Sequence, residues 1–361
     1  MTKKGLFLGL IVWVFWGVLI SCGSEGGGKP DYEFPSGNPE PGEGDSGPEA
    51  QGWQVTNAFG ELPVYLKVYK SPAVLRGKNA VAYIAVVDTE KEAEFLILGD
   101  VSGSKTPAQF YETETVKPAV IMNAGYFWDG NTVSMLCKEG RILAPAQPVW
   151  QSDLTFYPTR GAFGVGNDGV YDVNWVYTVG DQMYAYPAPA QNNEEETPLQ
   201  EPSADFPQGG RVWNVRHAIG GGPVLVKADV YQNTYSQELF GDASGIGALA
   251  NHPRSAIGIT RDQKLIFFVC EGRNVTPGVS GLTLEDVACI LKDLGCVDAL
   301  NLDGGGSSCM LINGKETIKP SSNGVQRAVV TAGGGGCSGG LFVFSFFYLQ
   351  VDMIEFKTIC L

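Results

Sequence analysis

Short apolar runs bounded by turn residues recur along the chain and predict many short strands. Apolar or alternating runs that end at Gly, Pro, Asn or Asp are typical of strands. Such runs occur at residues 63–69, 81–87, 95–98, 118–122, 255–260 and 265–270, and a hairpin is predicted over 135–143, with its turn at Gly140. The stretch 188–208 is rich in proline and glutamate, which predicts a long surface loop. The pattern therefore favours a sheet-rich core.

One helix is predicted between residues 283 and 295. Thr283 is suited to cap its first turn, where Glu285 and Asp286 favour the positive end of the helix dipole, and Gly295 is suited to end it. The apolar residues Leu284, Val287, Ala288 and Leu291 lie on one face at helical spacing. An apolar run over 297–302 follows and predicts a strand that ends at Asp303.

The first residues resemble an export signal. Lys3 and Lys4 precede an apolar run over 6–20, which is short for a membrane span but fits a signal peptide. The run ends Leu-Ile-Ser-Cys at Cys22, which resembles a bacterial lipobox, in which the cysteine becomes lipidated. A plain secretory signal with a chance cysteine is the alternative. The resemblance implies a lipid-anchored protein of the bacterial cell envelope, in the outer membrane.

Composition divides the chain into four segments. Residues 1–21 are the expected signal peptide, and residues 22–52, rich in Gly, Pro, Ser and Glu, predict a flexible tether. Residues 53–336 have globular composition and are expected to form one domain. Residues 337–361 contain a run of apolar and aromatic residues too short to span a bilayer. A buried strand, an exposed segment and a sequence artefact remain open for this tail.

Composition also limits the class of protein. The chain has 361 residues, of which 44% are hydrophobic and 18% are charged, enough to bury a sizeable core. With 48 glycines and 21 prolines, the turn-rich composition disfavours a helical bundle. We therefore expect an α+β fold, with a mixed β-sheet core of short strands and few helices packed on it. The formal net charge of -14 argues against nucleic acid as a partner.

Metal and cofactor motifs are weak in this sequence. The eight cysteines form no Cys-x-x-Cys pair and only two histidines are present, so no metal site is predicted. Most cysteines lie in apolar runs and are typical of small buried residues. No Gly-x-x-x-x-Gly-Lys match is followed by the Ser or Thr of a phosphate loop, since Pro30 follows the match at 23–29. The Gly-x-Ser-x-Gly match at 336–340 lies in a glycine-rich run, so a serine hydrolase of that type is disfavoured. We predict no cofactor, and the need for a divalent ion is left open.

The stretch from Asp303 to Ser308 carries the strongest chemical signal. Gly304, Gly305 and Gly306 let the backbone turn sharply and expose its N–H groups, which bind anions when they are gathered in a concave turn. Asp303 stands at the edge of this turn and Ser307 supplies a hydroxyl group. An anion site with a carboxylate beside it indicates chemistry on a phosphorylated substrate. A tight turn without chemical function is the alternative interpretation.

Arginines recur next to other glycine-rich strand ends. Arg254 precedes an apolar run, Arg273 follows Gly272, and Arg327 follows Asn323-Gly324. The planar guanidinium group donates parallel hydrogen bonds to phosphate and stays charged. Each of them taken singly is more often a solvated surface residue, so their recurrence beside glycine turns is what indicates a site.

Taken in order, these motifs resemble the phosphodiester glycosidases, the family of the mannose 6-phosphate uncovering enzyme. The resemblance extends over about residues 60–332. The matching segments are Asn123-Ala124-Gly125-Tyr126-Phe127, Gly220-Gly221-Gly222-Pro223, His252 to Gly258, Glu271-Gly272-Arg273, the helix from Leu284, Asp298 to Ser308, Asn313-Gly314-Lys315 and Arg327. The family usually has aspartate where this chain has Glu271. It also usually ends in a strand after the last arginine, and here that strand is expected to break into glycines after Ala332.

The resemblance implies hydrolysis of the bond between a sugar and a phosphodiester, with release of the sugar. Phosphate is a good leaving group, so charge neutralisation and positioning matter more than a general acid. Asp303 or Glu271 is expected to activate water or attack the anomeric carbon, and Asn123 to orient a sugar hydroxyl. His217 is a candidate for proton transfer, with a structural role as the alternative. The expected substrate-binding and phosphate-binding residues are Asn123, Gly125, Gly221, Gly222, Arg254, Arg273, Gly304, Gly305, Gly306, Ser307 and Arg327.

Two other functions fit the same residues. A lipid-anchored protein that binds phosphorylated or acidic glycans without turnover would use similar groups. Processing of an envelope polymer would keep the chemistry and change the substrate. The partner expected from the sequence is a sugar phosphodiester or an envelope glycan.

Overall fold

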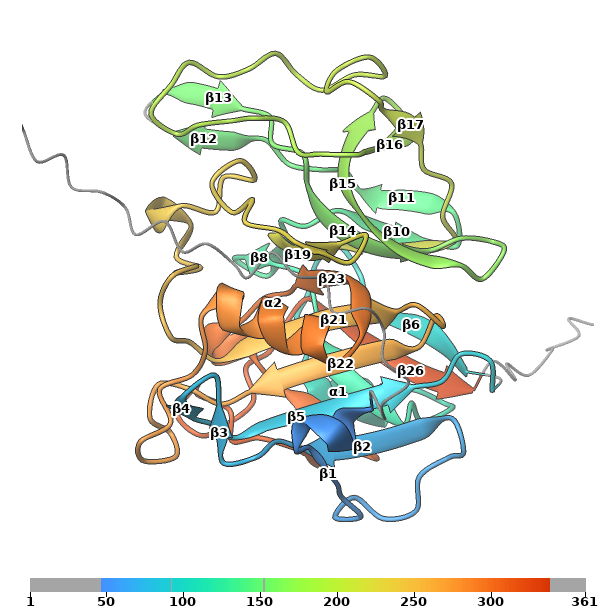
Figure 1. Cartoon of the computed structure of the whole chain (residues 1–361). Helices are drawn as coiled ribbons and strands as arrows, with labels where there is room; N and C mark the ends of the chain where they lie inside the picture. The colour runs from blue at the N-terminus through green and yellow to red at the C-terminus, as the bar shows by residue number, and fades with distance from the viewer. Residues whose placement is uncertain (1–46, 92, 152, 338–361) are drawn as a thin grey trace, which may run out of the picture. The chain divides into compact units, whose positions relative to one another are not determined.

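The computed structural model describes residues 47–91, 93–151 and 153–337, all within one compact unit, Asp45–Leu361. The expected signal peptide, lipidated Cys22, most of the expected tether and tail residues 338–361 lie outside the described residues. The last residues of that tether, Pro48–Gln51, form a 3-10 helix. The α+β prediction is confirmed: three sheets dominate and two α-helices accompany them (Figure 1). In the described ranges, no helix is both long and apolar enough to span a membrane.

The largest sheet has eight strands, and its neighbouring pairs are antiparallel. In spatial order the strands are β1 (Gln54–Val55), β2 (Leu66–Lys70), β5 (Ala82–Val87), β22 (Leu265–Cys270), β21 (Arg254–Thr260), β23 (Cys296–Asn301), β19 (Val224–Lys227) and β20 (Val230–Tyr231). The chain leaves β22, forms helix α2 (Leu284–Asp293) and returns as β23 on the other side of β21. This split β-α-β connection brings the strand before Asp303 beside β21.

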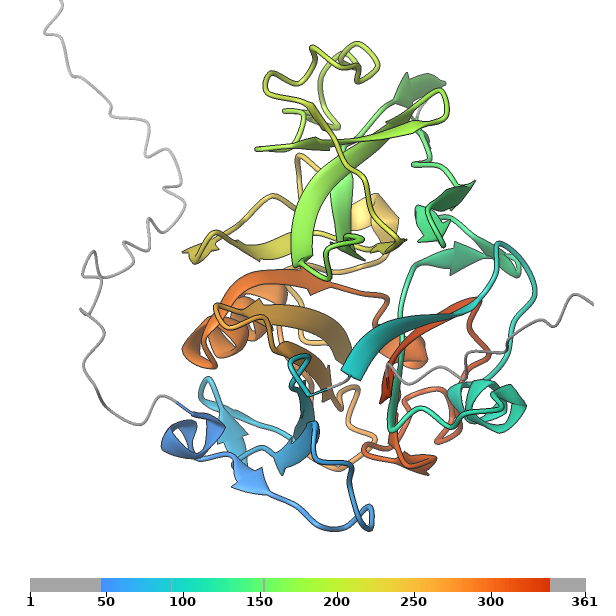
Figure 2. The ribbon, with the colours of Figure 1, turned by 90° about the vertical axis from the view of Figure 1, so that its right-hand side faces the viewer.

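A second sheet has seven antiparallel strands. Their spatial order is β11 (Arg141–Ala144), β10 (Leu136–Lys138), β18 (His217–Gly220), β14 (Arg160–Val165), β15 (Tyr171–Val179), β16 (Gln182–Tyr186) and β17 (Arg211–Val212). Strands β14 and β15 contact β19 and β23 of the first sheet, and Figure 2 shows these green strands next to the orange β23. The hydrophobic pattern did not predict β14, β15 or β16.

A third sheet has five antiparallel strands. Their order is β25 (Lys315–Glu316), β24 (Met310–Ile312), β7 (Val120–Asn123), β26 (Thr331–Cys337) and β6 (Ala93–Gly99). Helix α1 (Pro107–Thr113) packs on this sheet through Phe110. The remaining described elements are the hairpins β3 (Val74–Leu75) with β4 (Lys78–Asn79), β8 (Phe127–Trp128) with β9 (Asn131–Thr132), and β12 (Val149–Gln151) with β13 (Leu154–Phe156), and the 3-10 helices Asp242–Ser244 and Gly305–Ser307.

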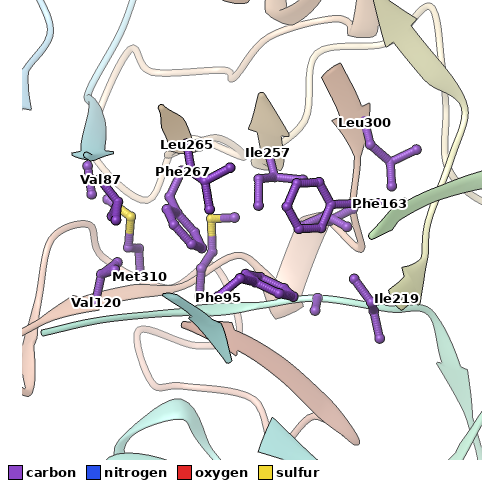
Figure 3. Close-up of a cluster of buried hydrophobic side chains, with 14 of the residues drawn as sticks. Val87, Phe95, Val120, Phe163, Ile219, Ile257, Leu265, Phe267, Leu300 and Met310 are labelled. Atoms are coloured by element: carbon purple, nitrogen blue, oxygen red, sulfur yellow. The ribbon is translucent and has the colours of Figure 1, made fainter. Parts of the chain in front are cut away.

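The main core lies where the three sheets meet. Phe95 of β6 packs edge-on against Phe163 of β14, with ring centroids 4.8 Å apart, and stacks with Phe267 of β22 at 6.4 Å. Burial of a side chain of this size stabilises a fold by about 1.5–3 kcal/mol. Figure 3 shows side chains from all three sheets in this cluster, among them Val120, Ile219, Ile257 and Met310.

The opposite face of the eight-stranded sheet packs on helix α2. Side chains alternate along β22: Phe267 faces the main core, while Ile266 and Phe268 join the second cluster with Val287 and Leu291 of α2. The helix begins as the sequence predicts, because Thr283 and Asp286 form a reciprocal capping box. The sheet is therefore buried on both faces, which explains its continuous apolar runs.

The expected break after Ala332 is wrong. Strand β26 continues through four glycines to Cys337, between β7 and β6. A Cβ at Gly333 would lie 2.9 Å from the Phe95 ring, and one at Gly335 would lie 3.1 Å from a methyl group of Val87. The glycines make room for core side chains, so a pattern that disfavours strands locally is stabilised by packing.

Candidate active site

A pocket of about 370 Å³ lies at one end of the central strands. Strands β22 and β23 end there and β21 begins there, because each is antiparallel to its neighbour β21. The pocket joins the ends of these strands to hairpin β8–β9 and to the start of β14. Its lining residues are Tyr126, Phe127, Trp128, Val133, Arg160, Phe240, Ser244, Gly245, Ile246, His252, Arg254, Arg273, Asn301, Asp303, Gly304, Gly305, Gly306 and Arg327.

Asp303 is the one carboxylate in this lining among the residues that the structure describes. Its backbone N–H donates to Ala124 O at 2.9 Å, which ties the end of β23 to the segment after β7. Burial raises the pKa of Asp303 to about 6, and hydrogen bonds from Ser307 and the Gly304 N–H, with the charge of Arg327, oppose that rise. The Asp303 carboxylate therefore titrates close to neutral pH, as catalytic acids and bases often do.

The glycine turn after Asp303 has arginine side chains lying directly over its backbone. A Cβ at Gly305 would lie 2.8 Å from Nη2 of Arg273, and a Cβ at Gly306 would overlap Nη2 of Arg327. Gly305 also has a left-handed φ of 59°. Arg273 and Arg327 are exposed, and both line the pocket. Two guanidinium groups therefore converge over a glycine backbone beside Asp303. The predicted cradle of exposed N–H groups is not formed at Gly304 and Gly305, whose N–H groups donate to the Asp303 carboxylate and to Pro253 O.

Replacing Gly306 with Ala tests this arrangement. The added methyl group must displace the guanidinium group of Arg327, so we expect kcat/KM for a phosphodiester substrate to fall about 10-fold, the value of one charge-assisted hydrogen bond. Steady-state kinetics measures this change. Gly324→Ala is a control for the cost of replacing a glycine, because an added Cβ there has nothing within 4 Å, but the left-handed φ of 77° adds strain, which thermal unfolding measures. Equal kinetics for the Gly306→Ala variant and the wild type would contradict the arrangement.

Asn123 lies beneath the site and is not among the residues that line the pocket. It is fully buried, and its Nδ2 donates to the carbonyl oxygen of Asp303 at 2.5 Å. Its Oδ1 accepts from Ser255 Oγ at 2.7 Å and from Cys309 N at 3.1 Å. With its polar atoms bonded in this way, the geometry favours positioning of the Asp303 backbone over the predicted contact with a sugar hydroxyl.

The other predicted glycines, Gly125, Gly221 and Gly222, are not among the residues that line the pocket, and they make close backbone contacts. Gly221 N donates to Gly161 O, Gly222 N donates to Asn301 O, and Gly125 N donates to Thr331 Oγ1. Their N–H groups are thus bonded within the protein. A Cβ at Gly221 would lie 2.5 Å from Asn301 O. These glycines allow β18 and β23 to approach, and this geometry does not favour a direct phosphate contact.

Arg254 lines the pocket, but its nitrogens donate to backbone carbonyls. It is 2% exposed, and burial lowers its pKa to about 10. Nε donates to Leu282 O at 3.0 Å, Nη1 to Ile246 O at 3.0 Å, and Nη2 to Gly247 O and Ala250 O, both at 2.7 Å. The side chain ties the loop over 246–250 to the segment before α2. This geometry favours a positioning role over the phosphate contact that the sequence suggested.

Glu271 is buried next to the site and is not among the lining residues. Its Oε1 accepts from Lys319 N at 3.0 Å, and its Oε2 is buried with no hydrogen-bond partner among the described residues. The loop that it holds continues to Ser321, whose Oγ donates to Gly305 O at 3.0 Å. Glu271 thus supports the loop that contacts the glycine turn. This geometry favours a positioning role for Glu271 over the catalytic role that the sequence suggested.

We expect Glu271→Gln to change kcat/KM by less than about 10-fold, the value of one lost charge-assisted bond. The amide oxygen of Gln keeps the acceptor for Lys319 N, and the pocket lining is unchanged. Initial-rate measurements on a glycosyl phosphodiester test this expectation. A loss as large as that of an Asp303 variant would return Glu271 to a catalytic role.

His217 lies at the start of β18, whereas Gly221 and Gly222 follow the other end of that strand. Its Nε2 is 3.2 Å from Glu139 Oε1, and its Nδ1 accepts from Glu139 N at 3.4 Å. Burial lowers its pKa. The side chain is not among the pocket-lining residues, so its geometry fits the structural alternative.

Several pocket residues were not assigned a role from the sequence. Tyr126 donates to Gly222 O at 2.7 Å and accepts from Asn301 Nδ2 at 2.8 Å, which links two of the motifs. These two residues and His252 lie inside the matching segments, so the motifs offered a signal for them. Arg160 and Phe240 lie outside those segments, and no local pattern indicated them.

Metal ligands are not clustered in the described part of the chain. No group of three or more His, Cys, Asp or Glu side chains there is placed to hold a metal ion. Cysteines 137, 270, 289, 296 and 309 are free thiols.

Comparison with known proteins identifies similarities over much of the chain. The family model of the phosphodiester glycosidases matches residues 117–334. A mouse protein, N-acetylglucosamine-1-phosphodiester alpha-N-acetylglucosaminidase, is 23% identical over 245 residues, which are 66% of this chain and 41% of that protein. An uncharacterized prophage-derived protein of Bacillus subtilis, YomE, is 42% identical over 79 residues, 22% of this chain and 12% of that protein. The chain thus spans less than two thirds of either curated relative.

Solved structures share the fold. The catalytic domain of the zebrafish N-acetylglucosamine-1-phosphodiester alpha-N-acetylglucosaminidase, auto-inhibited by its pro-peptide, matches with a TM-score of 0.51 and 21% identity, over 79% of this chain and 87% of that one. A hypothetical protein from Synechocystis matches with a TM-score of 0.51 and 17% identity, over 75% of this chain and 62% of that one. At these identities the likeness concerns the fold alone.

Proposed function

This chain belongs to the phosphodiester glycosidase family, and we propose that it hydrolyses the bond between a sugar and a phosphodiester, releasing the free sugar. The observation that carries the proposal is the pocket in which Asp303 stands beside a bare glycine turn with Arg273 and Arg327 over it. A phosphodiester bound by the two arginines would place the anomeric carbon of its sugar next to Asp303.

In the proposed reaction, the phosphodiester group lies over Gly304–Gly306 and between the two guanidinium groups. The bond between the anomeric carbon and the phosphate oxygen breaks, a phosphate monoester leaves with the electron pair, and oxygen from water ends on the sugar. The two arginines neutralise the charge that gathers on the leaving oxygen. The N–H groups of Gly304 and Gly305 do not take part, because they donate to the Asp303 carboxylate and to Pro253 O. Because this leaving group is a weak base, the reaction does not depend on a second carboxylic acid.

Asp303 supplies the remaining step. As a carboxylate it either attacks the anomeric carbon or takes a proton from the attacking water. Asn123 holds the backbone of Asp303, and Ser307 and the Gly304 N–H hold its side chain. The carboxylate is therefore oriented before substrate binds, which reduces the entropy cost of reaching the reactive geometry.

Hydrolysis is tested by incubating the purified protein with a sugar linked at C1 to a 4-nitrophenyl phosphodiester. The expected products are free sugar and 4-nitrophenyl phosphate in equal amounts, measured by a reducing-sugar assay and chromatography. Binding detected by calorimetry without release of sugar, over a range of pH values and with added divalent ions, would favour the alternative of a non-catalytic glycan-binding protein.

We further propose that lipidation of Cys22 anchors the protein in the bacterial envelope, at the outer membrane. The support is the lipobox-like sequence before Cys22. We expect Cys22→Ala to abolish incorporation of labelled palmitate and to move the protein from the membrane fraction to the soluble fraction. Unchanged labelling of the variant would contradict lipidation at this position.

A further inference from the structure

Arg160 is a third guanidinium group in the pocket, on a different wall from the proposed phosphate site. It begins β14 of the seven-stranded sheet, whereas Arg273 and Arg327 lie over the glycine turn after β23. Tyr126 lines the same pocket, and its ring packs on Phe240 with centroids 5.5 Å apart. Arg160 therefore reaches the pocket from another sheet than the glycine turn beside Asp303.

The guanidinium group of Arg160 is held rigidly. Nε donates to Glu238 O and Nη2 donates to Leu239 O, both at 3.0 Å. The group lies 4.4 Å from the centroid of the Phe240 ring, in a cation–π contact. Within the described residues, no hydrogen bond of Nη1 to the protein is present, and Arg160 lines the pocket. A fixed cation with an unused donor at a pocket wall is suited to bind an anion at low entropy cost.

The acidic residue behind Arg160 does not form an ion pair with it. The Glu238 carboxylate is fully buried and accepts four hydrogen bonds from other groups, which are the N–H groups of Gly161 and Val224, Trp175 Nε1 and Thr234 Oγ1. Burial raises the pKa of Glu238, and these four hydrogen bonds oppose that rise. The contacts of Arg160 with this segment are to backbone carbonyls. The negative charges of Glu238 and Glu194 both act on Arg160. Oε1 of Glu194 accepts a hydrogen bond from Gly241 N at 3.2 Å, next to Phe240 in the chain.

Charge balance in the pocket points to the ligand. Arg160, Arg254, Arg273 and Arg327 line the pocket with one carboxylate, Asp303, while Glu238 and Glu194 act on Arg160 from outside that lining. The single charge of a bound phosphodiester would leave the lining with an excess of positive charge. If the proposed function holds, the phosphate lies at the glycine turn and the sugar extends beyond Asp303, toward Arg160. We infer that the sugar recognised here is acidic, and that Arg160 binds a carboxylate on its ring. This inference rests on the proposed function and names its substrate class.

The test compares three substrates that differ only in the sugar. These are 4-nitrophenyl phosphodiesters of a hexuronic acid, the corresponding hexose and the corresponding 2-acetamido hexose, each prepared as both anomers. We expect kcat/KM to be at least about 10-fold higher for the hexuronic acid, as one charge-assisted hydrogen bond provides. The same ranking is expected for the dissociation constants measured by calorimetry on the Asp303→Asn protein.

Arg160→Gln distinguishes recognition from support of the fold. We expect the variant to lose the preference for the hexuronic acid, so that the ratio of the two kcat/KM values approaches one. A purely structural role would lower both values by the same factor and leave the ratio unchanged. If the variant does not fold, the test rests on the kcat/KM values of the wild type for the three substrates. Equal values, or a higher value for the 2-acetamido sugar, would overturn the inference.

Failure of the inference and failure of the proposed function are separable. If none of the three substrates releases sugar, the proposed function fails. The dissociation constants then still decide the recognition of the acidic sugar, and equal binding of the three ligands overturns it. If all three are hydrolysed at similar rates, the proposed function stands and the inference about Arg160 is wrong.

Discussion

Replacement of Asp303 by Asn is expected to lower sugar release from a glycosyl phosphodiester by on the order of 10²–10⁴-fold, the range for loss of a general base. Asn has the shape of Asp and can keep the hydrogen bonds from Ser307 and the Gly304 N–H. It cannot take up a proton or attack the anomeric carbon. In the part of the chain that the structure describes, no other carboxylate lines the pocket that could replace it. Initial rates on the purified variant measure the loss.

The matched control is Asp262→Asn, at an exposed carboxylate in the turn between β21 and β22, paired with Lys264. Its rate is expected to equal that of the wild type, since it lies at the opposite end of β21 from Arg254. Thermal unfolding of both variants verifies that they are folded. An Asp303→Asn protein that releases sugar at the wild-type rate would remove Asp303 from the chemistry.

The pH dependence of the wild type follows from the same carboxylate. Burial raises the pKa of Asp303 to about 6, and the reaction requires the ionised form. We therefore expect kcat/KM to fall as the pH decreases through about 6. A pH–rate profile of the wild type tests this expectation. A rate that stays constant down to about pH 4, the pKa of an ordinary aspartate, would show that Asp303 does not act as a base or nucleophile.

The same shift affects stability with a definite sign. The folded pKa lies above the unfolded value, so folding favours the protonated acid, and its contribution is lost as the pH rises from 3.8 to about 6. Above that window the ionised Asp303 destabilises the fold. We expect Asp303→Asn to be more stable than the wild type at about pH 7, by at most ~3 kcal/mol. The difference should vanish below about pH 4 in denaturant titrations.

Removing the two exposed arginines is the second change with a large expected effect. Arg273→Gln and Arg327→Gln should each lower kcat/KM about 10- to 100-fold, because each removes a charge-assisted hydrogen bond to the phosphodiester. The double variant should lose more than either single variant. The losses should appear mainly in KM if the arginines bind substrate and transition state equally, and mainly in kcat if they act on the developing charge of the leaving phosphate.

Arg261→Gln is the matched control for these variants. Arg261 has an 80% exposed side chain in an ion pair with Asp229, and it lies in the turn that follows β21. Its loss should leave the kinetics unchanged. Raising the salt concentration should increase the KM of the wild type, and this dependence should be weaker in the double variant. If the Arg273/Arg327 double variant behaves like Arg261→Gln, the glycine turn is not the phosphate site.

Elements with a clear local pattern were predictable from the sequence. Helix α2 has its cap at Thr283 and an apolar face at helical spacing, and both appear in the structure. Strands β5, β21 and β22 occur where continuous apolar runs end at turn residues. Strand β26 could not be predicted, because its glycines fit only against Phe95 and Val87, which are far from them in the sequence.

The sequence did not show which arginines face the pocket and which are bonded inside the protein. Arg254, Arg273 and Arg327 all stand beside glycine turns in the sequence. In the structure Arg254 donates to four carbonyl groups in a buried position, while the other two are exposed over Gly305 and Gly306. The two candidate carboxylates differ in the same way. Asp303 lines the pocket, whereas Glu271 is buried and accepts a hydrogen bond from Lys319 N.

The sequence by itself determined the family, the α+β class and the backbone segments that form the candidate site. These properties depend on glycine turns, strand ends and helix caps, whose preferences are set by residues close together in the chain. The tertiary structure alone decided which charged side chains face the pocket and which are bonded beneath it, and it added Arg160 to the site. The physical reason is that burial, hydrogen-bond partners and pKa depend on contacts between distant segments, such as Glu271 with Lys319 and Arg160 with Phe240.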